Sequence, residues 1–253
     1  MNPSASELRS KPVALITGGS SGIGLGIARR LLERDCHVVL SARGRDRLDQ
    51  LVAELGVTGV AADVSTEEGR ALLVAEVRRR GRIDWLVNNA GTGGGTAGLD
   101  VDVARARRVL EPNFYAHVAL TRELWPLLRE SPRARVIVVS SSLGTYSSSG
   151  SITYGASKAA LTSWGRALAV AARPEGIEVT VVNPGPVVTT TFPHDELLQH
   201  RWKGKLVIGV ERCVDDVMDT VDRGGGEVWS HRVFRLPAVL QAIAPATYDR
   251  FFV

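Results

Sequence analysis

The chain has 253 residues, of which 44% are hydrophobic and 23% are charged, and its formal net charge is +4. These proportions are typical of a soluble globular protein and exclude a largely disordered chain. No apolar run approaches the roughly 20 residues that a membrane-spanning helix needs, and residues 1–11 hold no apolar segment typical of a secretory signal. Cys36 and Cys213 are the only cysteines, too few for a disulfide scaffold. We therefore expect a cytoplasmic protein.

The positive charge comes mainly from scattered arginines, whose densest cluster is Arg78, Arg79, Arg80 and Arg82. This cluster would close a helix, where cations interact favourably with the helix dipole. No aromatic residues are interleaved with it and no binding motif accompanies it, so we expect no nucleic-acid partner.

Short β-branched segments alternate with longer helical segments, a pattern typical of βαβ units with a parallel sheet. Strands are expected at 12–17, 37–41, 57–63, 83–87, 135–140, 177–182 and 224–230. Helices are expected at 22–34, 45–55, 65–80, 100–130, 153–173 and 212–222, with short helical pieces in 236–252 separated at Pro245. Ser65 and Glu68 have the spacing of a capping box. The expected fold is α/β, a doubly wound parallel β-sheet flanked by helices on both faces.

No repeat or linker divides the chain, so residues 1–253 are expected to form a single domain. Within it we expect residues 1–11 to be flexible. The segment 186–210 has little periodicity and is expected to form a loop or lid, and 231–253 forms an apolar tail.

A glycine-rich segment, Thr17 to Gly24, lies between the first expected strand and the first expected helix. Such a turn presents backbone N–H groups and a helix N-terminus to a diphosphate. The spacing is not G-x-G-x-x-G, because Ile27 stands at the place of the third glycine, and no Gly-Lys-Ser/Thr follows. The position on the first strand of a doubly wound sheet favours a dinucleotide site over a purely structural turn.

The end of the second strand distinguishes between two cofactors. An acidic residue there would bind the ribose 2′-hydroxyl of NAD, whereas arginine suits a 2′-phosphate. Here the strand ends in Ser41-Ala42-Arg43, and the first carboxylate is Asp46. This favours NADP(H), with NAD(H) as the second candidate.

Tyr154 and Lys158 lie four residues apart at the start of an expected helix, so both side chains share one face. A phenol ionises at about pH 10, and a nearby ammonium group stabilises the phenolate and lowers its pKa. The pair could therefore exchange a proton with a substrate. Such pairs are common on helix surfaces, so the spacing alone does not identify a site.

Together these motifs resemble the short-chain dehydrogenase/reductase family in its one-domain form. The matching segments are TGGSSGIG at 17–24, Asp63-Val64, Asn88-Asn89-Ala90-Gly91, Asn113, the serines at 140–142, Tyr154-x-x-x-Lys158 and Asn183-Pro184-Gly185. They occur in the family's order and spacing. The resemblance implies a Rossmann fold and an oxidoreductase that transfers a hydride between nicotinamide and a carbonyl or secondary alcohol.

The resemblance also implies catalytic roles. Tyr154 would be the acid/base that protonates the carbonyl oxygen, and Lys158 would hold the nicotinamide ribose and lower the pKa of Tyr154. Ser141 lies thirteen residues before Tyr154 and three before Gly144, which is the family's spacing for the serine that binds the carbonyl. Asn113 would hold a water that links Lys158 to solvent.

Pro112 precedes Asn113 and is a departure from the family pattern. Proline has no backbone N–H and disfavours helical geometry at the residue before it, so we expect a kink there.

Further residues would contact the cofactor by the same resemblance. Around the phosphates and ribose these are Gly18, Ser20, Ser21, Gly22, Ile23 and Gly24. On the adenosine side they are Arg43, Asp63, Val64, Asn89, Ala90 and Gly91. On the nicotinamide side they are Pro184, Gly185, Val187 and Thr189, with Tyr154 and Lys158. Asn88 is expected to tie neighbouring strands together instead.

The expected lid contains Thr190, Thr191, Phe192, Pro193, Leu197, Leu198 and Trp202. A concave site with such a lining would accept a lipophilic carbonyl or alcohol. The apolar tail would close this pocket, pack on a partner subunit or contact a membrane surface, and simple packing is favoured. The resemblance implies a homodimer or homotetramer formed through the long helical regions 100–130 and 153–173.

The rival hypotheses are weaker. The five histidines show no metal-ligand spacing, and no Gly-x-Ser-x-Gly elbow follows a strand. The main alternative is a non-catalytic NADP(H)-binding regulatory or scaffold protein on the same fold.

Overall fold

The computed structural model describes residues 11–93, 102–189 and 206–250, and the backbone of 251–252. Within these ranges seven parallel strands form one sheet in the order β3-β2-β1-β4-β5-β6-β7. The strands are β1 (Val13–Thr17), β2 (His37–Ala42), β3 (Thr58–Ala61), β4 (Trp85–Asn88), β5 (Arg135–Val139), β6 (Glu178–Val182) and β7 (Gly226–Val228). The strand order runs outward from β1 and β4 in both directions, which is the doubly wound Rossmann topology. The predicted fold class is confirmed.

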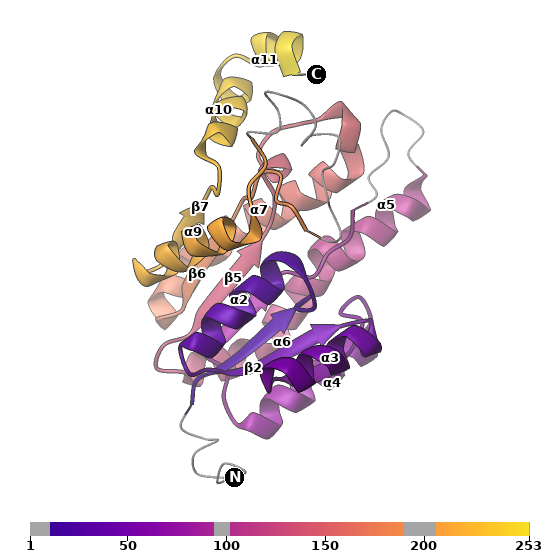
Figure 1. Ribbon diagram of the computed structural model, residues 1–253. Coiled ribbons are helices and arrows are strands. Elements are labelled where there is room, and N and C mark those ends of the chain that lie inside the picture. Colours follow the sequence, from indigo (N-terminus) through magenta and orange to yellow (C-terminus); the bar gives the residue numbers. More distant parts are fainter. Residues whose placement is uncertain (1–10, 94–101, 190–205, 253) are drawn as a thin grey trace.

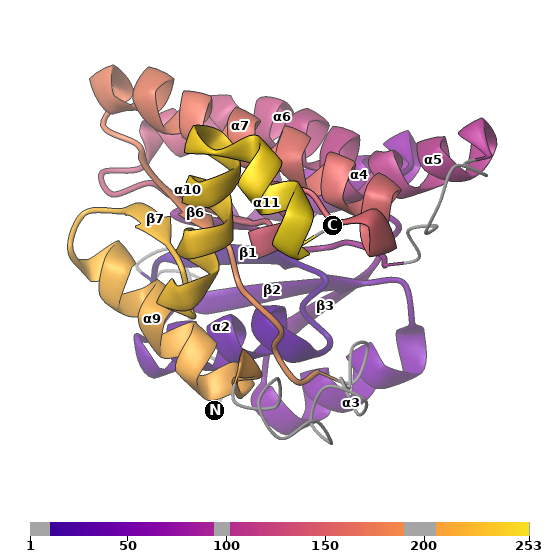
Figure 2. The ribbon, with the colours of Figure 1, turned by 90° about the horizontal axis from the view of Figure 1, so that it is seen from above.

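Helices cover both faces of this sheet. The helices are α2 (Gly22–Glu33), α3 (Arg45–Leu55), α4 (Glu67–Arg80), α5 (Val103–Leu110), α6 (Ala116–Glu130), α7 (Ile152–Ala172), α9 (Val210–Asp222), α10 (Arg235–Ile243) and α11 (Pro245–Phe252). Seen from above, α4, α6 and α7 lie on one side of the strands, and α2, α3 and α9 lie on the other (Figure 2).

The inner strands are buried on both faces because each face packs on a helical layer. In β1, Ala14 and Ile16 belong to the core that contains Leu31 of α2. Leu15, between them, points the opposite way and packs in the core that contains Leu73 of α4. The sheet therefore has one apolar core on each side.

The predicted capping box at Ser65 is wrong. Helix α4 begins at Glu67, and its cap is Thr66, whose Oγ1 accepts a hydrogen bond from Gly69 N at 3.0 Å. Ser65 N donates instead to Asp63 Oδ1 at 2.9 Å. This turn closed by the aspartate side chain holds Ser65 outside the helix, one residue too early to cap it.

The long helical region expected at 100–130 is divided by a π-helical turn, η1 (Glu111–Tyr115). Ala116 N donates to the Glu111 carbonyl, five residues back. Pro112 lies inside this turn and supplies no N–H. The disturbance of the helix expected at Asn113 is therefore a π turn, with α5 before it and α6 after it (Figure 1).

The tail forms two short helices, and α11 begins at Pro245, a favoured first helical position. The predicted division at Pro245 is thus confirmed. In Figure 1, α10 and α11 lie at one end of the molecule, beyond the end of the sheet at which β7 leads into them. Most of the expected lid, 190–205, lies outside the described residues, as do residues 1–10 and the side chains of Phe251 and Phe252.

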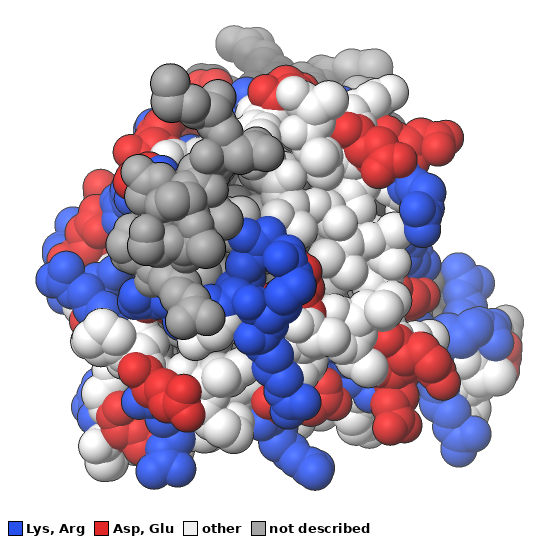
Figure 3. All heavy atoms as spheres, turned by 90° about the horizontal axis from the view of Figure 1, so that it is seen from below, with Lys and Arg blue, Asp and Glu red and all other residues white. Residues whose placement is uncertain are grey.

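The arginine cluster at the end of α4 engages in local ion pairs. Arg79 and Arg80 both bind Glu76, and Arg82 binds Asp84. On the face seen in Figure 3, basic and acidic side chains likewise lie among one another. Three arginines of the cluster lie in the last turn of α4, where their charge interacts favourably with the helix dipole, as the sequence predicts.

Candidate active site

The glycine-rich turn after β1 lies directly against the segment that follows β4. A Cβ atom on Gly18, whose φ is +62°, would lie 2.8 Å from the Ala90 Cα atom. Asn89 Nδ2 donates to the carbonyls of Thr17 and Gly18 at 2.9 and 3.0 Å. Because β1 and β4 are followed by helices on opposite faces, this is the switch point at which ligands bind in such sheets.

The glycine-rich turn leads directly into the N-terminus of α2. Its cap residue, Ser21, makes no side-chain cap hydrogen bond, and the first turn holds no acidic residue. The Ser21 carbonyl accepts its bond from Leu25 N at 3.2 Å. The side chain of Thr189 lies close to Gly22, within 3.0 Å of where a Cβ would stand. The structure thus brings Thr189 to the end of the helix that could hold an anion.

Tyr154 and Lys158 lie on the first turns of α7, as predicted. Lys158 Nζ is 5.9 Å from the centre of the Tyr154 ring and donates to the Val139 carbonyl at 3.0 Å. The hydroxyl of Ser141, which follows β5, lies within reach of the Tyr154 side chain. The structure therefore gathers these three side chains at the carboxyl end of β5.

Burial sets the protonation of this group. Burial raises the pKa of Tyr154, and the hydrogen bond from Ser141 opposes that rise. Burial also lowers the pKa of Lys158 to about 8. The prediction that Tyr154 has a lowered pKa is therefore wrong for the protein alone, because removal from water disfavours the phenolate more than its neighbours stabilise it.

Asn113 lies fully buried beside this group. Its Oδ1 atom accepts from Thr92 N at 2.7 Å, and its Nδ2 atom donates to Thr92 O at 3.0 Å and to Ser157 Oγ at 2.9 Å. Ser157 Oγ in turn donates to the Tyr154 carbonyl at 2.7 Å. Both amide hydrogens are used, so the side chain ties the segment after β4 to α7.

Gly91 connects these groups to the segment after β4. A Cβ atom on it would lie 3.0 Å from Asn113 Oδ1 and 3.6 Å from Lys158 Nζ. The absence of a side chain at this position therefore lets the segment approach Lys158.

Of the adenosine-side residues, Arg43, Asp63 and Val64 follow β2 and β3, in the other half of the sheet. Arg43 directly follows β2 and is exposed, whereas Val64 is buried. Asp63 Oδ1 is engaged with Ser65 N. Strands β1 and β4 lie between β2, which Arg43 follows, and β5, which leads to Ser141, so the structure does not bring Arg43 or Asp63 to Tyr154.

Asn88 binds a helix where a strand contact is predicted. Its Nδ2 atom donates to Thr121 Oγ1 of α6 at 2.8 Å. The expectation of a strand-to-strand tie is wrong because the side chain points out of the sheet plane toward the covering helix, as side chains of strands do.

Ser140 and Ser142 have structural contacts. Ser140 Oγ donates to the Lys158 carbonyl at 2.9 Å and lies 2.6 Å from Thr162 Oγ1. Ser142 N donates to the Pro184 carbonyl at 2.8 Å. Of the three serines, Ser141 is the one whose side chain meets Tyr154.

His117 is a buried residue that sequence reasoning did not place in this site. Its Nε2 atom is 2.8 Å from the Ala90 carbonyl. Burial, reinforced by the charge of Lys158, lowers the pKa of His117 to about 3. The neutral ring therefore donates to Ala90 and fixes the segment beside the glycine-rich turn. The signal available was its spacing, four residues after Asn113 on one helical face.

A family model described as short chain dehydrogenase matches residues 12–197. The chain belongs to this family. The uncharacterized oxidoreductase YbbO of Escherichia coli is 33% identical over 177 residues, which cover 69% of this chain and 65% of that protein. Dehydrogenase/reductase SDR family member 4 of Sus scrofa is 35% identical over 193 residues, covering 72% and 69%.

A solved structure of a short-chain dehydrogenase from Sphingobium yanoikuyae in complex with NADPH has a TM-score of 0.77 and 28% identity. The match covers 94% of this chain and 96% of that one. The family match ends before α9, α10 and α11, so the tail lies outside it. Among the described residues, no helix is both long and apolar enough to span a membrane.

Proposed function

We propose that this member of the short chain dehydrogenase family is an NADP(H)-dependent oxidoreductase that interconverts a lipophilic ketone and its secondary alcohol. One observation carries the proposal: the Tyr154 side chain lies within reach of the Ser141 hydroxyl and beside the buried ammonium of Lys158, at the sheet edge that also holds the glycine-rich turn. A proton donor and a carbonyl-binding hydroxyl thus stand together next to a dinucleotide-type site.

The glycine-rich turn has the chemistry that a dinucleotide requires. The cap side chain of α2 makes no bond to the first-turn N–H groups, and no carboxylate stands in that turn. The positive φ of Gly18 and the close packing of Ala90 leave no room for a side chain there. These residues fit a diphosphate at the helix N-terminus, with Ser20, Ser21 and Ile23 lining the turn.

The preference for NADP(H) rests on Arg43. This exposed arginine directly follows β2, where a guanidinium could reach a ribose 2′-phosphate, and no carboxylate occupies the position. The 28%-identical Sphingobium structure, which is in complex with NADPH, supports the same choice.

The bound nicotinamide would supply the hydride. Ser141 would donate a hydrogen bond to the substrate carbonyl oxygen, and Tyr154 would donate the proton to that oxygen. The raised pKa of Tyr154 keeps the phenol protonated at neutral pH, which is the state that reduction needs. The reverse reaction needs the phenolate and is therefore favoured by alkaline conditions.

Lys158 would hold the ribose hydroxyls and supply positive charge as Tyr154 loses its proton. Its pKa of about 8 leaves the ammonium mostly protonated at pH 7. The side-chain amide of Asn113 is already engaged with Thr92 and Ser157. The water expected at Asn113 would therefore bind its main-chain carbonyl, near the π turn.

A direct test is to mix the purified protein with NADPH and a panel of aryl and long-chain ketones. We expect loss of NADPH absorbance that depends on the ketone. The alternative, a non-catalytic NADP(H)-binding protein, predicts tight NADPH binding with no turnover of any carbonyl in the panel. The Ser141, Tyr154 and Lys158 arrangement favours turnover.

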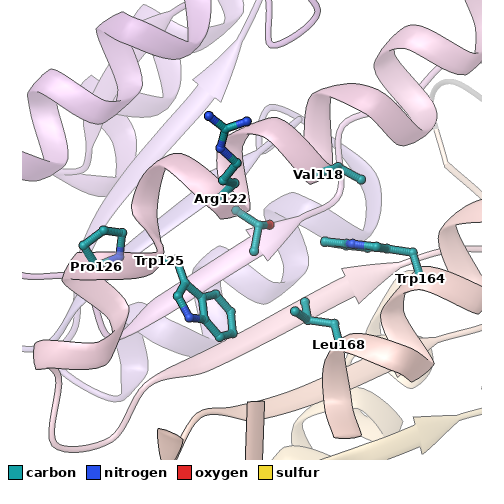
Figure 4. A pocket seen from close by; sticks show the side chains of 7 residues that line it. Val118, Arg122, Trp125, Pro126, Trp164 and Leu168 are labelled. Atoms are coloured by element: carbon teal, nitrogen blue, oxygen red, sulfur yellow. The ribbon is translucent and has the colours of Figure 1, made fainter. Parts of the chain in front are cut away.

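We also propose a homodimer formed through α6 and α7. A hollow of about 380 Å³ lies on the outer side of these helices, and none of the proposed site residues line it. Trp125, Trp164 and Leu168 form its apolar wall (Figure 4). Sedimentation should show a dimer for the native chain and a monomer for Leu168→Arg. Leu236→Arg, on the exposed face of α10, is the matched control and should leave the dimer intact.

A further inference from the structure

Two residues of the C-terminal tail converge on Ser147, a residue of the loop between Ser141 and Tyr154. Gln241, on α10, accepts a hydrogen bond from Ser147 N at 2.9 Å and donates from Nε2 to Ser147 Oγ at 2.8 Å. Tyr248, on α11, donates from its hydroxyl to the Ser147 carbonyl. The backbone N–H, the backbone carbonyl and the side chain of Ser147 are therefore all engaged by the tail.

The loop itself has few other restraints. Residues 145–148 lie between two 3-10 turns, Ser142–Gly144 and Ser149–Ser151, and contain no regular element. Thr145 is held to the Ser142 carbonyl by its N–H and its hydroxyl. Ser147 is exposed, and its backbone and side chain are held by the bonds from the tail. An exposed polar residue gains a fixed position only through such bonds.

Tyr248 also packs against this loop. It is 1% exposed, and its ring centre lies 6.5 Å from that of Tyr146. The Tyr146 hydroxyl lies 3.4 Å from Ser142 Oγ. A continuous set of contacts therefore runs from α11 through Tyr146 to the residue next to Ser141.

The tail reaches the opposite side of the same region through Phe234. A Cβ atom on Gly185 would lie 2.3 Å from the Phe234 ring, so the ring covers this glycine. The neighbouring Pro184 carbonyl accepts from Ser142 N at 2.8 Å. The segment 234–248 thus contacts both the turn after β6 and the loop after β5.

We infer that Gln241 and Tyr248 are positioning residues that fix the loop 145–148, and that this clamp sets the substrate-side wall of the site. The inference rests on the proposed function, because the wall matters only if a carbonyl substrate binds at Ser141. It assigns the tail a task beyond simple packing. The cofactor cradle is built by β1, α2 and the segment after β4, which the clamp does not touch.

The inference predicts that loss of the clamp changes the binding of the ketone but not the binding of NADPH. Loss of the clamp should free the loop and weaken ketone binding, so the KM for the ketone rises. The affinity for NADPH should stay the same. If the tail only stabilised the fold, loss of these bonds would lower the melting temperature. It would then change the affinities for the ketone and for NADPH together, or leave both unchanged.

The test uses Tyr248→Phe, which removes only the hydroxyl, and Gln241→Leu, which removes both amide bonds. Ile243→Ala is the matched control, because Ile243 is on the same tail and 77% exposed. We measure hydrogen exchange of the peptide 143–151, the Kd for NADPH and the KM for the ketone. In each clamp variant we expect faster exchange in that peptide. The KM should rise about 3- to 10-fold in Tyr248→Phe, the equivalent of one hydrogen bond, and at least as much in Gln241→Leu, which loses two. The control should match the native chain in all three.

If hydrogen exchange of the peptide 143–151 is unchanged in the clamp variants, Gln241 and Tyr248 do not fix the loop. If exchange is faster but the KM for the ketone is unchanged, the clamp does not position the substrate side of the site. The same conclusion follows if the affinity for NADPH falls as much as the affinity for the ketone. If the native protein reduces no ketone, the proposed function fails, and the exchange measurement still decides whether the tail holds the loop.

Discussion

Lys158 Nζ lies 5.9 Å from the centre of the Tyr154 ring, on the same face of α7 and one helical turn further along. Lys158 is 4% exposed, and its ammonium donates to the Val139 carbonyl. The fold therefore keeps a positive charge in a place where burial disfavours it. Buried charges with a shifted pKa are typical of functional sites, which supports the role proposed for Lys158 beside Tyr154.

Replacing Lys158 by Met should stabilise the folded protein relative to the native chain, and the gain should shrink at alkaline pH. The folded pKa of about 8 lies below the ordinary 10.5, so the unfolded chain binds more protons between these values. Native stability therefore rises with pH across this window. From pH 7 to pH 10 the difference between the two proteins should narrow by about 2–3 kcal/mol.

Denaturant unfolding of both proteins at the two pH values measures this. The lost bond to Val139 lowers the stability of the variant equally at both pH values, so it does not affect the comparison. A difference that is constant with pH would contradict the burial of a charged Lys158.

Ser141→Ala should reduce kcat/KM for ketone reduction by about 10²-fold, the usual effect of removing one donor to a developing oxyanion. Ser142→Ala is the control, because Ser142 Oγ has only a 3.4 Å contact with the Tyr146 hydroxyl. Steady-state kinetics of the two variants measure the difference. Equal losses in both would show that Ser141 has no special role.

Arg43→Ala should weaken NADPH binding by about tenfold, the usual value of a hydrogen bond to a charged group. NADH binding should not change, because NADH lacks the 2′-phosphate. Fluorescence titration with both cofactors measures this. Tighter binding of NADH than of NADPH by the native protein would refute the cofactor preference.

His117→Gln should make the protein less sensitive to acid. The pKa of His117 is about 3 in the folded protein and 6.5 ordinarily, so the unfolded chain binds an extra proton between these values. Native stability is therefore lost as pH falls through this window. Between pH 6.5 and 5 the native protein should lose about 1–2 kcal/mol more than the variant. Glutamine retains a donor for the Ala90 carbonyl and does not titrate, and parallel losses in the two proteins would contradict a buried neutral His117.

The sequence predicts the parallel sheet well because its inner strands are short, β-branched and buried, and longer helical segments separate them. The motif residues could also be placed, since the carboxyl ends of parallel strands share one edge. Ser141 was separable from Ser140 and Ser142 by its spacing to Tyr154, and the contacts with Tyr154, Thr162 and Pro184 agree with that choice.

Other features depend on contacts between distant segments that no local pattern encodes. The bond from His117 to Ala90 spans 27 residues, and the bonds from Gln241 and Tyr248 to Ser147 span 94 and 101. The pKa of Tyr154 also could not be predicted from the Lys158 spacing. Its direction depends on burial, which is a property of the folded core.

The most direct test of the central claim compares the native protein with Tyr154→Phe, using NADPH and a ketone that the native protein reduces. The variant should still bind NADPH, because the glycine-rich turn and Arg43, which would hold the phosphates, are unchanged. Ketone-dependent loss of NADPH absorbance should fall by about 10³-fold or more in the variant, as expected when a general acid is removed. Equal turnover by the two proteins would contradict the role of Tyr154 as the proton donor.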